Sequence, residues 1–267
     1  MKNKMKFSEY LIESSFYSNH HNMTKDECID YIRKNCNQMD YNKPLLRGMK
    51  GSSDYIKIEE MPRPRVSRDG NNMHTALLDY HFSKNGGYPL RSKSLICADI
   101  SSLNMTKGYG KVYAIFPKNN VKIGIVMDDR DIFNSKSKIL GRERDLIEIN
   151  FAVADFLGIS ATSNNHDDKI KSVEDIKKII DKKDFTSYRE YNVDGDAWAV
   201  VRYIGEDMLD NKDHIYKSII EIYNPDNFNF DVITNKDIDS YNNVEAWFSG
   251  ECIAIQYDVW KEIKDIL

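Results

Sequence analysis

Residues 90–98 read Leu90-Arg91-Ser92-Lys93-Ser94-Leu95-Ile96-Cys97-Ala98, and this stretch leads from a polar segment into an apolar one. The apolar end predicts a core strand over residues 95–98. Within a strand, alternation directs the side chains of Ser92 and Ser94 to one face, beside the cations Arg91 and Lys93. The stretch therefore predicts a polar site where a core strand begins, or else an ordinary edge strand with solvated serines.

Short apolar runs broken by Gly, Asn and Asp predict further strands on both sides of this stretch. These strands are expected at residues 45–49, 111–116, 122–127, 197–204, 245–248 and 252–257. Helical spacing of apolar residues predicts helices over residues 8–17, 24–35, 72–82, 142–157 and 172–181. Thr24 with Glu27 forms a capping-box sequence, and Ser172 is a typical N-cap. Asn119-Asn120 fits the turn of a hairpin.

The order of these elements predicts the fold class. Strands stand before and after a central helical block, with few strand-helix-strand alternations, which is typical of an α+β fold with mainly antiparallel sheets. The 267 residues, 41% of them hydrophobic, are enough for a sizeable core. We expect one domain over residues 1–267, with a helical N-terminal segment over residues 1–40 and a helical insertion at about residues 134–190.

Composition excludes several classes of function. The formal net charge of −4 provides no general field for holding nucleic acid. A short cationic cluster, Arg63, Arg65 and Arg68 near Tyr55, leaves RNA binding as an alternative to a proline-stiffened loop. No signal-peptide pattern and no apolar stretch long enough to cross a bilayer occurs, so we expect a cytoplasmic protein without a membrane partner. The four cysteines lack CxxC spacing, and we expect them to be reduced.

Common site motifs are missing from the sequence. The six histidines include His74 and His81, whose spacing of seven separates them by two helical turns, so we expect no metal site. The sequence has no P-loop, no GxGxxG and no GxSxG motif, which argues against those nucleotide-binding loops and against a hydrolase triad.

Two charged residues stand at the ends of apolar runs. Arg47 follows Leu45-Leu46 and precedes Gly48, where a guanidinium could bind phosphate or carboxylate with two hydrogen bonds, or form a surface ion pair. Glu245 opens the run Ala246-Trp247-Phe248, which is consistent with a catalytic carboxylate or with an ordinary glutamate at a hairpin edge.

The order Arg47, Ser92-Lys93-Ser94, Glu245 resembles the Arg-Ser-Glu pattern of mono-ADP-ribosyltransferases, a toxin-like family with bacterial and bacteriophage members. Leu45-Leu46-Arg47-Gly48 looks like the first motif of the family, and residues 90–97 look like the second. Lys93 stands where the family usually has Thr, and Asn243 stands where it often has Glu or Gln. The resemblance covers about residues 44–133 and 241–255. Within the family, the chain is similar to bacteriophage-encoded members.

The resemblance implies a split sandwich of two mainly antiparallel sheets that form an NAD cleft flanked by helices. It implies an NAD-dependent glycosyltransferase that moves ADP-ribose to a macromolecular acceptor, a protein rather than a nucleic acid, with NAD hydrolysis as a side activity. NAD is then a substrate, no metal takes part, and the chain is a phage or bacterial effector in the cytoplasm of a bacterial host. A non-catalytic relative that acts as a phage structural or host-interaction protein is the alternative.

The resemblance also assigns roles to residues. Glu245 would stabilise the positive charge that develops on the ribose, as in glycoside hydrolysis. Arg47 would bind a phosphate of the dinucleotide, and Ser92 would hydrogen-bond Glu245. The remaining expected contacts are Gly48, Arg91, Ser94 and Tyr109 for NAD, with Tyr109 over the nicotinamide, and Tyr241 and Asn243 for the acceptor. Glu251 is the second candidate for the carboxylate.

Overall fold

The structure is a computed structural model that describes residues 20–59, 72–85, 87–127, 129–160, 170–189 and 195–267. The chain forms two compact units, and each unit is discontinuous in sequence. Unit 1 comprises Met1–Arg65, Tyr88–Arg130 and Asp231–Leu267, and unit 2 comprises Val66–Gly87 and Asp131–Phe230. The chain therefore leaves unit 1 and returns to it twice.

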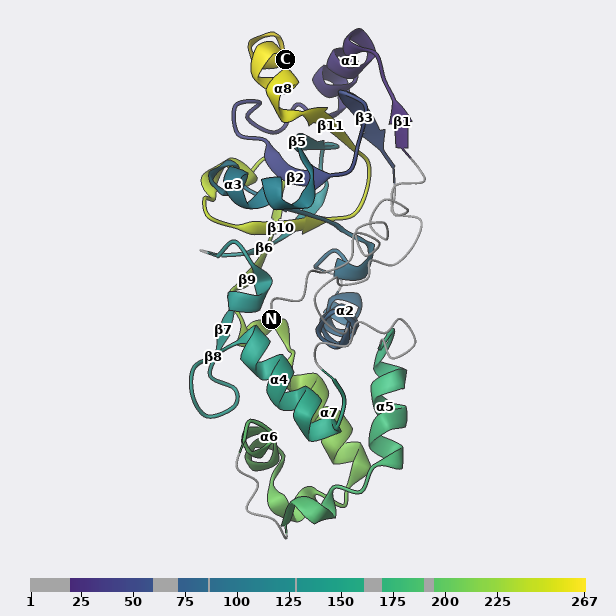
Figure 1. Cartoon of the computed structure of the whole chain (residues 1–267), viewed down its shortest axis with the longest axis vertical. Helices are drawn as coiled ribbons and strands as arrows, with labels where there is room; N and C mark the ends of the chain where they lie inside the picture. The colour runs from purple at the N-terminus through teal and green to yellow at the C-terminus, as the bar shows by residue number, and fades with distance from the viewer. Residues whose placement is uncertain (1–19, 60–71, 86, 128, 161–169, 190–194) are drawn as a thin grey trace, which may run out of the picture. The chain divides into compact units, whose positions relative to one another are not determined.

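Unit 1 contains a nine-stranded sheet, coloured from purple to yellow in Figure 1. The pairings along it from β1 to β6 are all antiparallel, as expected for an α+β fold. In sheet order the strands are β1 (His20–Asn22), β3 (Tyr55–Ile58), β11 (Cys252–Gln256), β5 (Lys111–Pro117), β2 (Leu45–Met49), β4 (Leu95–Ala98), β10 (Glu245–Phe248), β6 (Lys122–Val126) and β9 (Phe230–Thr234).

The sheet has a narrow junction in its middle. β2 pairs with β5 along its whole length, from Leu45 to Met49, whereas β2 and β4 pair at Leu46 and Ala98. One hydrophobic cluster nevertheless includes residues from both sides of this junction, such as Tyr113 of β5 and Ala246 of β10. The five-stranded half, β1 to β2, and the four-stranded half, β4 to β9, therefore share one core.

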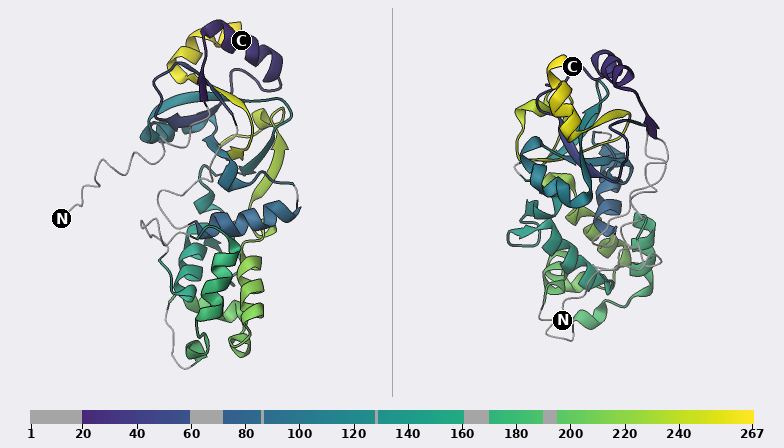
Figure 2. Two further views of the ribbon diagram at one scale, coloured as in Figure 1. Left: turned by 90° about the vertical axis from the view of Figure 1, so that its right-hand side faces the viewer. Right: turned by 45° about the horizontal axis from the view of Figure 1, so that its top comes forward.

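Helices cover the face of the five-stranded half that lies opposite the shared core. α1 (Lys25–Asn35) and α8 (Tyr257–Ile263) lie beside each other on it in all three views of Figures 1 and 2. Their apolar residues join Phe116 and Ile253 in a second hydrophobic cluster. The predicted capping box of α1 is confirmed, since Glu27 N donates to Thr24 Oγ1 and Thr24 N donates to Glu27 Oε2 at 2.8 Å.

Unit 2 is mainly helical. Within it α4 packs against α6, α5 packs against α7 and α2, and a two-stranded ribbon joins β7 to β8 (Figure 2). Its elements are α2 (Met73–Asn85), β7 (Lys136–Ser137), β8 (Arg144–Asp145), α4 (Leu146–Leu157), α5 (Val173–Lys182), α6 (Ala197–Ile204) and α7 (Lys212–Ile222). The helical part of the sequence thus runs well beyond the insertion expected at about residues 134–190.

Two sequence predictions about these elements are wrong. Residues 197–204 form α6 rather than a strand, because the residues buried in it include Ala197, Val200, Val201 and Ile204, which share one helical face. Asn119-Asn120 forms a turn, with Asn120 at φ 63°, but it does not close a hairpin. β5 lies between β11 and β2, whereas β6 lies between β10 and β9, so the turn carries the chain from one half of the sheet to the other.

Other predictions are confirmed. The strands at residues 45–49, 95–98 and 245–248 have the expected bounds, and α5 begins with a capping box formed by Ser172 and Asp175. All four cysteines are free and buried. The helix expected at residues 8–17, the arginine cluster at residues 63–68 and most of the loop at residues 160–168 lie outside the described residues.

Gly48 gives a test of how β2 packs. A Cβ at this position would overlap the carbonyl oxygen of Thr106 and lie 2.7 Å from Cβ of Tyr109, whereas a Cβ at Gly108 would meet nothing within 4 Å. We expect Gly48→Ala to lower the free energy of unfolding by about 1–3 kcal/mol, because the backbone of the covering turn has to move. Urea denaturation measures this, with Gly108→Ala as the matched control. Equal stability of the two variants would contradict the packing.

Candidate active site

Three neighbouring strands carry the candidate residues, since β4 lies between β2 and β10. Leu46 of β2 pairs with Ala98 of β4, and Ala98 pairs with Glu245 of β10. Cross-strand partners point to the same face of a sheet, and residues two apart in a strand share a face. Glu245 therefore shares its face with Gly48, whereas alternation directs the side chain of Arg47 to the opposite face.

Glu245 is held by Arg91. The Arg91 Nη2 atom lies 2.6 Å from Oε1 of Glu245, and the two side chains are only 3% and 9% exposed. The carboxylate stands at the first position of β10, where Glu245 N also donates to Asp129 O at 2.8 Å. The structure thus provides a buried, charge-paired carboxylate where β10 begins.

Arg91 reaches Glu245 from a helical turn and not from a strand. Arg91–Lys93 is a 3₁₀ turn, and β4 begins only at Leu95, so the predicted alternation of Ser92 and Ser94 along a strand is wrong. The turn is closed locally, because Ser94 Oγ donates to Leu90 O at 2.7 Å and Ser94 N donates to Arg91 O at 3.2 Å. Serine hydroxyls that bond the nearby backbone in this way compete with strand formation. Ser94 is fully buried, and Ser92 is half-buried.

Trp247 lies next to the ion pair. It is two residues after Glu245 and so shares its face, and its ring centroid lies 5.5 Å from Cζ of Arg91. The indole Nε1 donates to Pro89 O at 3.0 Å, and Tyr88 stacks on the ring with centroids 6.4 Å apart. A Cβ at Gly124 of the neighbouring strand β6 would overlap the indole. Trp247 thus lies directly against the backbone of β6 and supports Arg91.

Arg47 connects the two halves of the sheet. Its Nη1 atom donates to Ile96 O at 2.5 Å, beside the single β2–β4 residue pair. The pKa of the Cys97 thiol is raised to about 12, mainly by burial. The charge of Arg47 lowers this pKa and the charge of Glu245 raises it, so both charges act on the middle of β4. The shifted thiol is neutral at physiological pH and is no candidate nucleophile.

Gly48 and Tyr109 lie together. Tyr109 belongs to a 3₁₀ turn, Lys107–Tyr109, that packs on β2 over Gly48, and its side chain is 43% exposed. The Tyr109 side chain thus begins directly beside Gly48, and an exposed aromatic ring is a suitable wall for a flat heterocycle.

Tyr241 and Asn243 lie in the segment between β9 and β10. Tyr241 lines an open pocket of about 530 Å³ together with Lys122, Val232, Ile233, Thr234, Asp237 and Ser240. Asn243 adopts φ 60°, a left-handed conformation that Asn tolerates better than Glu or Gln, and its Oδ1 accepts a hydrogen bond from Arg130. Asn243 therefore shapes the turn that leads into Glu245.

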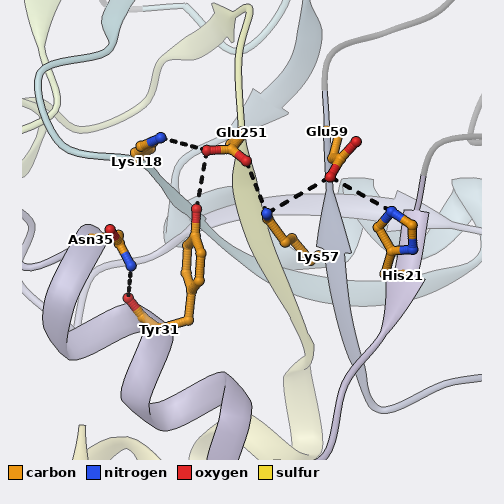
Figure 3. A network of polar contacts seen from close by, with 7 residues as sticks. All are labelled: His21, Tyr31, Asn35, Lys57, Glu59, Lys118 and Glu251. Atoms are coloured by element: carbon orange, nitrogen blue, oxygen red, sulfur yellow. Dashed lines mark hydrogen bonds and ion pairs between the residues drawn. The ribbon is translucent and has the colours of Figure 1, made fainter.

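Glu251, the second candidate carboxylate, belongs to a network of structural contacts (Figure 3). Its carboxylate lies 2.6 Å from Lys118 Nζ and 2.9 Å from Lys57 Nζ, and it accepts a hydrogen bond of 3.1 Å from the Tyr31 hydroxyl. The hydrogen bonds from Lys118 and Lys57 lower its pKa to about 2. Figure 3 shows Lys57 continuing to Glu59, which also contacts His21. Glu251 thus connects α1, β3 and the turn after β5, which favours Glu245 as the functional carboxylate.

Two members of the site are missing from the sequence-based interpretation, Trp247 and Gly124. Both left a signal in the sequence. Trp247 is two residues after Glu245 in a predicted strand, and a glycine inside a strand such as Lys122–Val126 often marks a close approach of another group. The contact of Arg91 with Glu245 left no signal in the sequence, because it joins residues far apart in the chain.

Among the residues that the structure describes, no cluster of three or more His, Cys, Asp or Glu side chains could hold a metal ion, and no helix is long and apolar enough to span a bilayer. Comparison with protein-family models, curated proteins and solved structures finds no match to this chain.

The Glu251 network predicts a pH-dependent loss of stability. The folded-state pKa near 2 lies below the ordinary 4.5, so the stabilisation is present above about pH 4.5 and is lost as the pH falls towards 2. We expect Glu251→Gln to lower the free energy of unfolding by about 1–3 kcal/mol at pH 7, with a smaller difference from wild type at pH 3. Urea denaturation at both pH values measures this. The exposed Glu262→Gln serves as the control, and a pH-independent difference would argue against the network.

Proposed function

We propose that the chain transfers ADP-ribose from NAD to a macromolecular acceptor. The observation that carries the proposal is the buried carboxylate of Glu245, which is paired with Arg91 at 2.6 Å on a strand joined through β4 to the strand of Arg47 and Gly48. The three sequence motifs that resemble mono-ADP-ribosyltransferases thus lie on, or directly before, three adjacent strands.

The chemistry suits a carboxylate. The bond between the ribose and the nicotinamide nitrogen breaks, nicotinamide leaves with the electron pair, and positive charge develops on the ribose. A fixed carboxylate beside the ribose stabilises this charge where it forms. A nucleophile of the acceptor then bonds to the ribose carbon and loses a proton, whereas attack by water gives hydrolysis of NAD.

The fold supports the same proposal. The five-stranded and four-stranded halves meet at the single pair Leu46–Ala98, and in the proposal the NAD cleft lies at this junction. In the proposal, Gly48 and Tyr109 form the nicotinamide side of this cleft, and Ser92 and Ser94 belong to the turn that presents Arg91. In the proposal Arg47 stabilises the junction through Ile96 O and does not bind a phosphate beside Glu245, because alternation directs its side chain to the opposite face of the sheet.

The acceptor side of the proposal is the segment before β10. Tyr241 lines the open pocket of about 530 Å³, and Asn243 sets the turn that leads into Glu245. An open pocket with both an acidic and a basic residue, Asp237 and Lys122, suits a protein side chain better than a polyanionic nucleic acid. We therefore propose a protein acceptor.

The proposal is tested with three glutamine variants of similar chemistry. We expect purified wild-type protein to release nicotinamide from NAD, and Glu245→Gln to do so about 100- to 1,000-fold more slowly, because the neutral amide does not stabilise the ribosyl cation. Glu251→Gln and Glu262→Gln are expected to keep activity within about threefold when they are measured well below their melting temperatures. Nicotinamide release is followed by chromatography, and acceptors are found with labelled NAD in bacterial extract.

Two outcomes would overturn the proposal. If wild-type protein binds NAD but neither hydrolyses it nor labels any component of the extract, the chain is a non-catalytic binding protein. If Glu251→Gln removes activity while Glu245→Gln keeps it, the carboxylate has been assigned to the wrong strand.

A further inference from the structure

The cation beside Glu245 is unexpected for the proposed reaction. A guanidinium 2.6 Å from the carboxylate partly cancels the negative field that would stabilise a ribosyl cation. Stability is not a sufficient reason for the pair either, because the cost of desolvating two buried charges often equals or exceeds their attraction. The pair therefore needs another explanation, and the contacts of Arg91 indicate one.

Arg91 is fixed from two directions. On the backbone side, the 3₁₀ turn that carries it is closed by the bond from Ser94 N to Arg91 O at 3.2 Å and by the bond from Ser94 Oγ to Leu90 O at 2.7 Å. On the side-chain side, its guanidinium carbon lies 5.5 Å from the ring centroid of Trp247. A guanidinium over an indole loses rotational freedom and gains a cation–π attraction.

Trp247 is itself fixed. Its Nε1 donates to Pro89 O, two residues before Arg91, and its ring lies where any side chain at Gly124 would overlap it. Arg91 and Glu245 are thus joined twice, once directly and once through Trp247, which belongs to the strand of Glu245. The carboxylate of Glu245 is thus contacted by a guanidinium that is itself held through the strand of Glu245.

We propose that Arg91 is a positioning residue that orients the carboxylate of Glu245, with Trp247 as its support. The inference rests on the proposed function. With Oε1 held by Arg91, the direction of Oε2 follows from the planar geometry of the carboxylate, so that the group meets the ribose without first having to rotate. In the proposal Arg91 acts through Glu245 and not on NAD, because its guanidinium lies between the Glu245 carboxylate and the Trp247 ring. This assigns Arg91 a different role from the NAD contact that the sequence resemblance implies.

Steady-state kinetics with NAD separates positioning from binding. We expect Arg91→Gln to lower kcat about 30- to 100-fold, because a misplaced carboxylate loses most of its effect, and to change KM for NAD less than threefold. Arg91→Lys keeps the charge but lacks the planar fork, so it is expected to recover only part of kcat. Arg202→Gln, an exposed arginine of α6 in unit 2, is the matched control and is expected to match wild type.

Non-additivity gives the second readout. If Arg91 acts only through Glu245, the double variant Arg91→Gln with Glu245→Gln loses no more kcat than Glu245→Gln alone. Trp247→Phe, which keeps an aromatic ring but lacks the N–H that bonds Pro89 O, is expected to reduce kcat about three- to tenfold in the same direction. Near-ultraviolet circular dichroism reports whether Arg91→Gln is folded. If it is not, Trp247→Phe serves as the test.

The outcomes distinguish the inference from the function on which it rests. No turnover of NAD by wild-type protein overturns the proposed function, and the inference with it. The inference alone is overturned if wild type turns over NAD and Arg91→Gln has an unchanged kcat. If only Trp247→Phe folds, an unchanged kcat of that variant overturns it. A large rise of KM with normal kcat, or losses that multiply in the double variant, also overturns it, because Arg91 would then contact NAD directly.

Discussion

β4 is paired on both sides, with β2 at Ala98 and with β10 along its whole length, and the placement of the candidate site depends on this strand. The row Leu46–Ala98–Glu245 sets which face the carboxylate takes, and the turn just before β4 supplies Arg91. Because β2 and β4 separate beyond that row, the sheet divides into two halves without losing its shared core.

The sequence was informative where local pattern decides structure. Apolar runs such as Leu95–Ala98 gave correct strands, and Thr24 with Glu27 gave a correct helix start, because each depends on neighbours in the chain. The turn at Asn119-Asn120 was found, but its hairpin was not formed, since the partner of a strand is decided by packing far away in sequence. For residues 197–204 the local pattern was also insufficient. Their β-branched residues favour a strand, but the spacing of the buried residues is helical.

The candidate site was predictable in its parts and not in its connections. The chain order of the three motifs and the place of Glu245 at the head of an apolar run indicated this carboxylate, but neither indicates which cation reaches it. Ser94 shows why: its hydroxyl bonds the carbonyl of Leu90 and converts the expected strand into a turn, and that turn points Arg91 at Glu245. The contact between Arg91 and Glu245 therefore depends on a local hydrogen bond that the apolar pattern of the sequence does not indicate.

The double interruption of unit 1 by unit 2 has a consequence for the order in which the site can form. β4 follows the first segment of unit 2 in the chain, and β10 follows the second, which ends at Phe230. During synthesis from the N-terminus, β4 therefore has no β10 partner until both segments of unit 2 have been made, and pairing across so many residues is slow. The row Leu46–Ala98–Glu245, which sets the face of the carboxylate, therefore forms only after residue 245 has been synthesised.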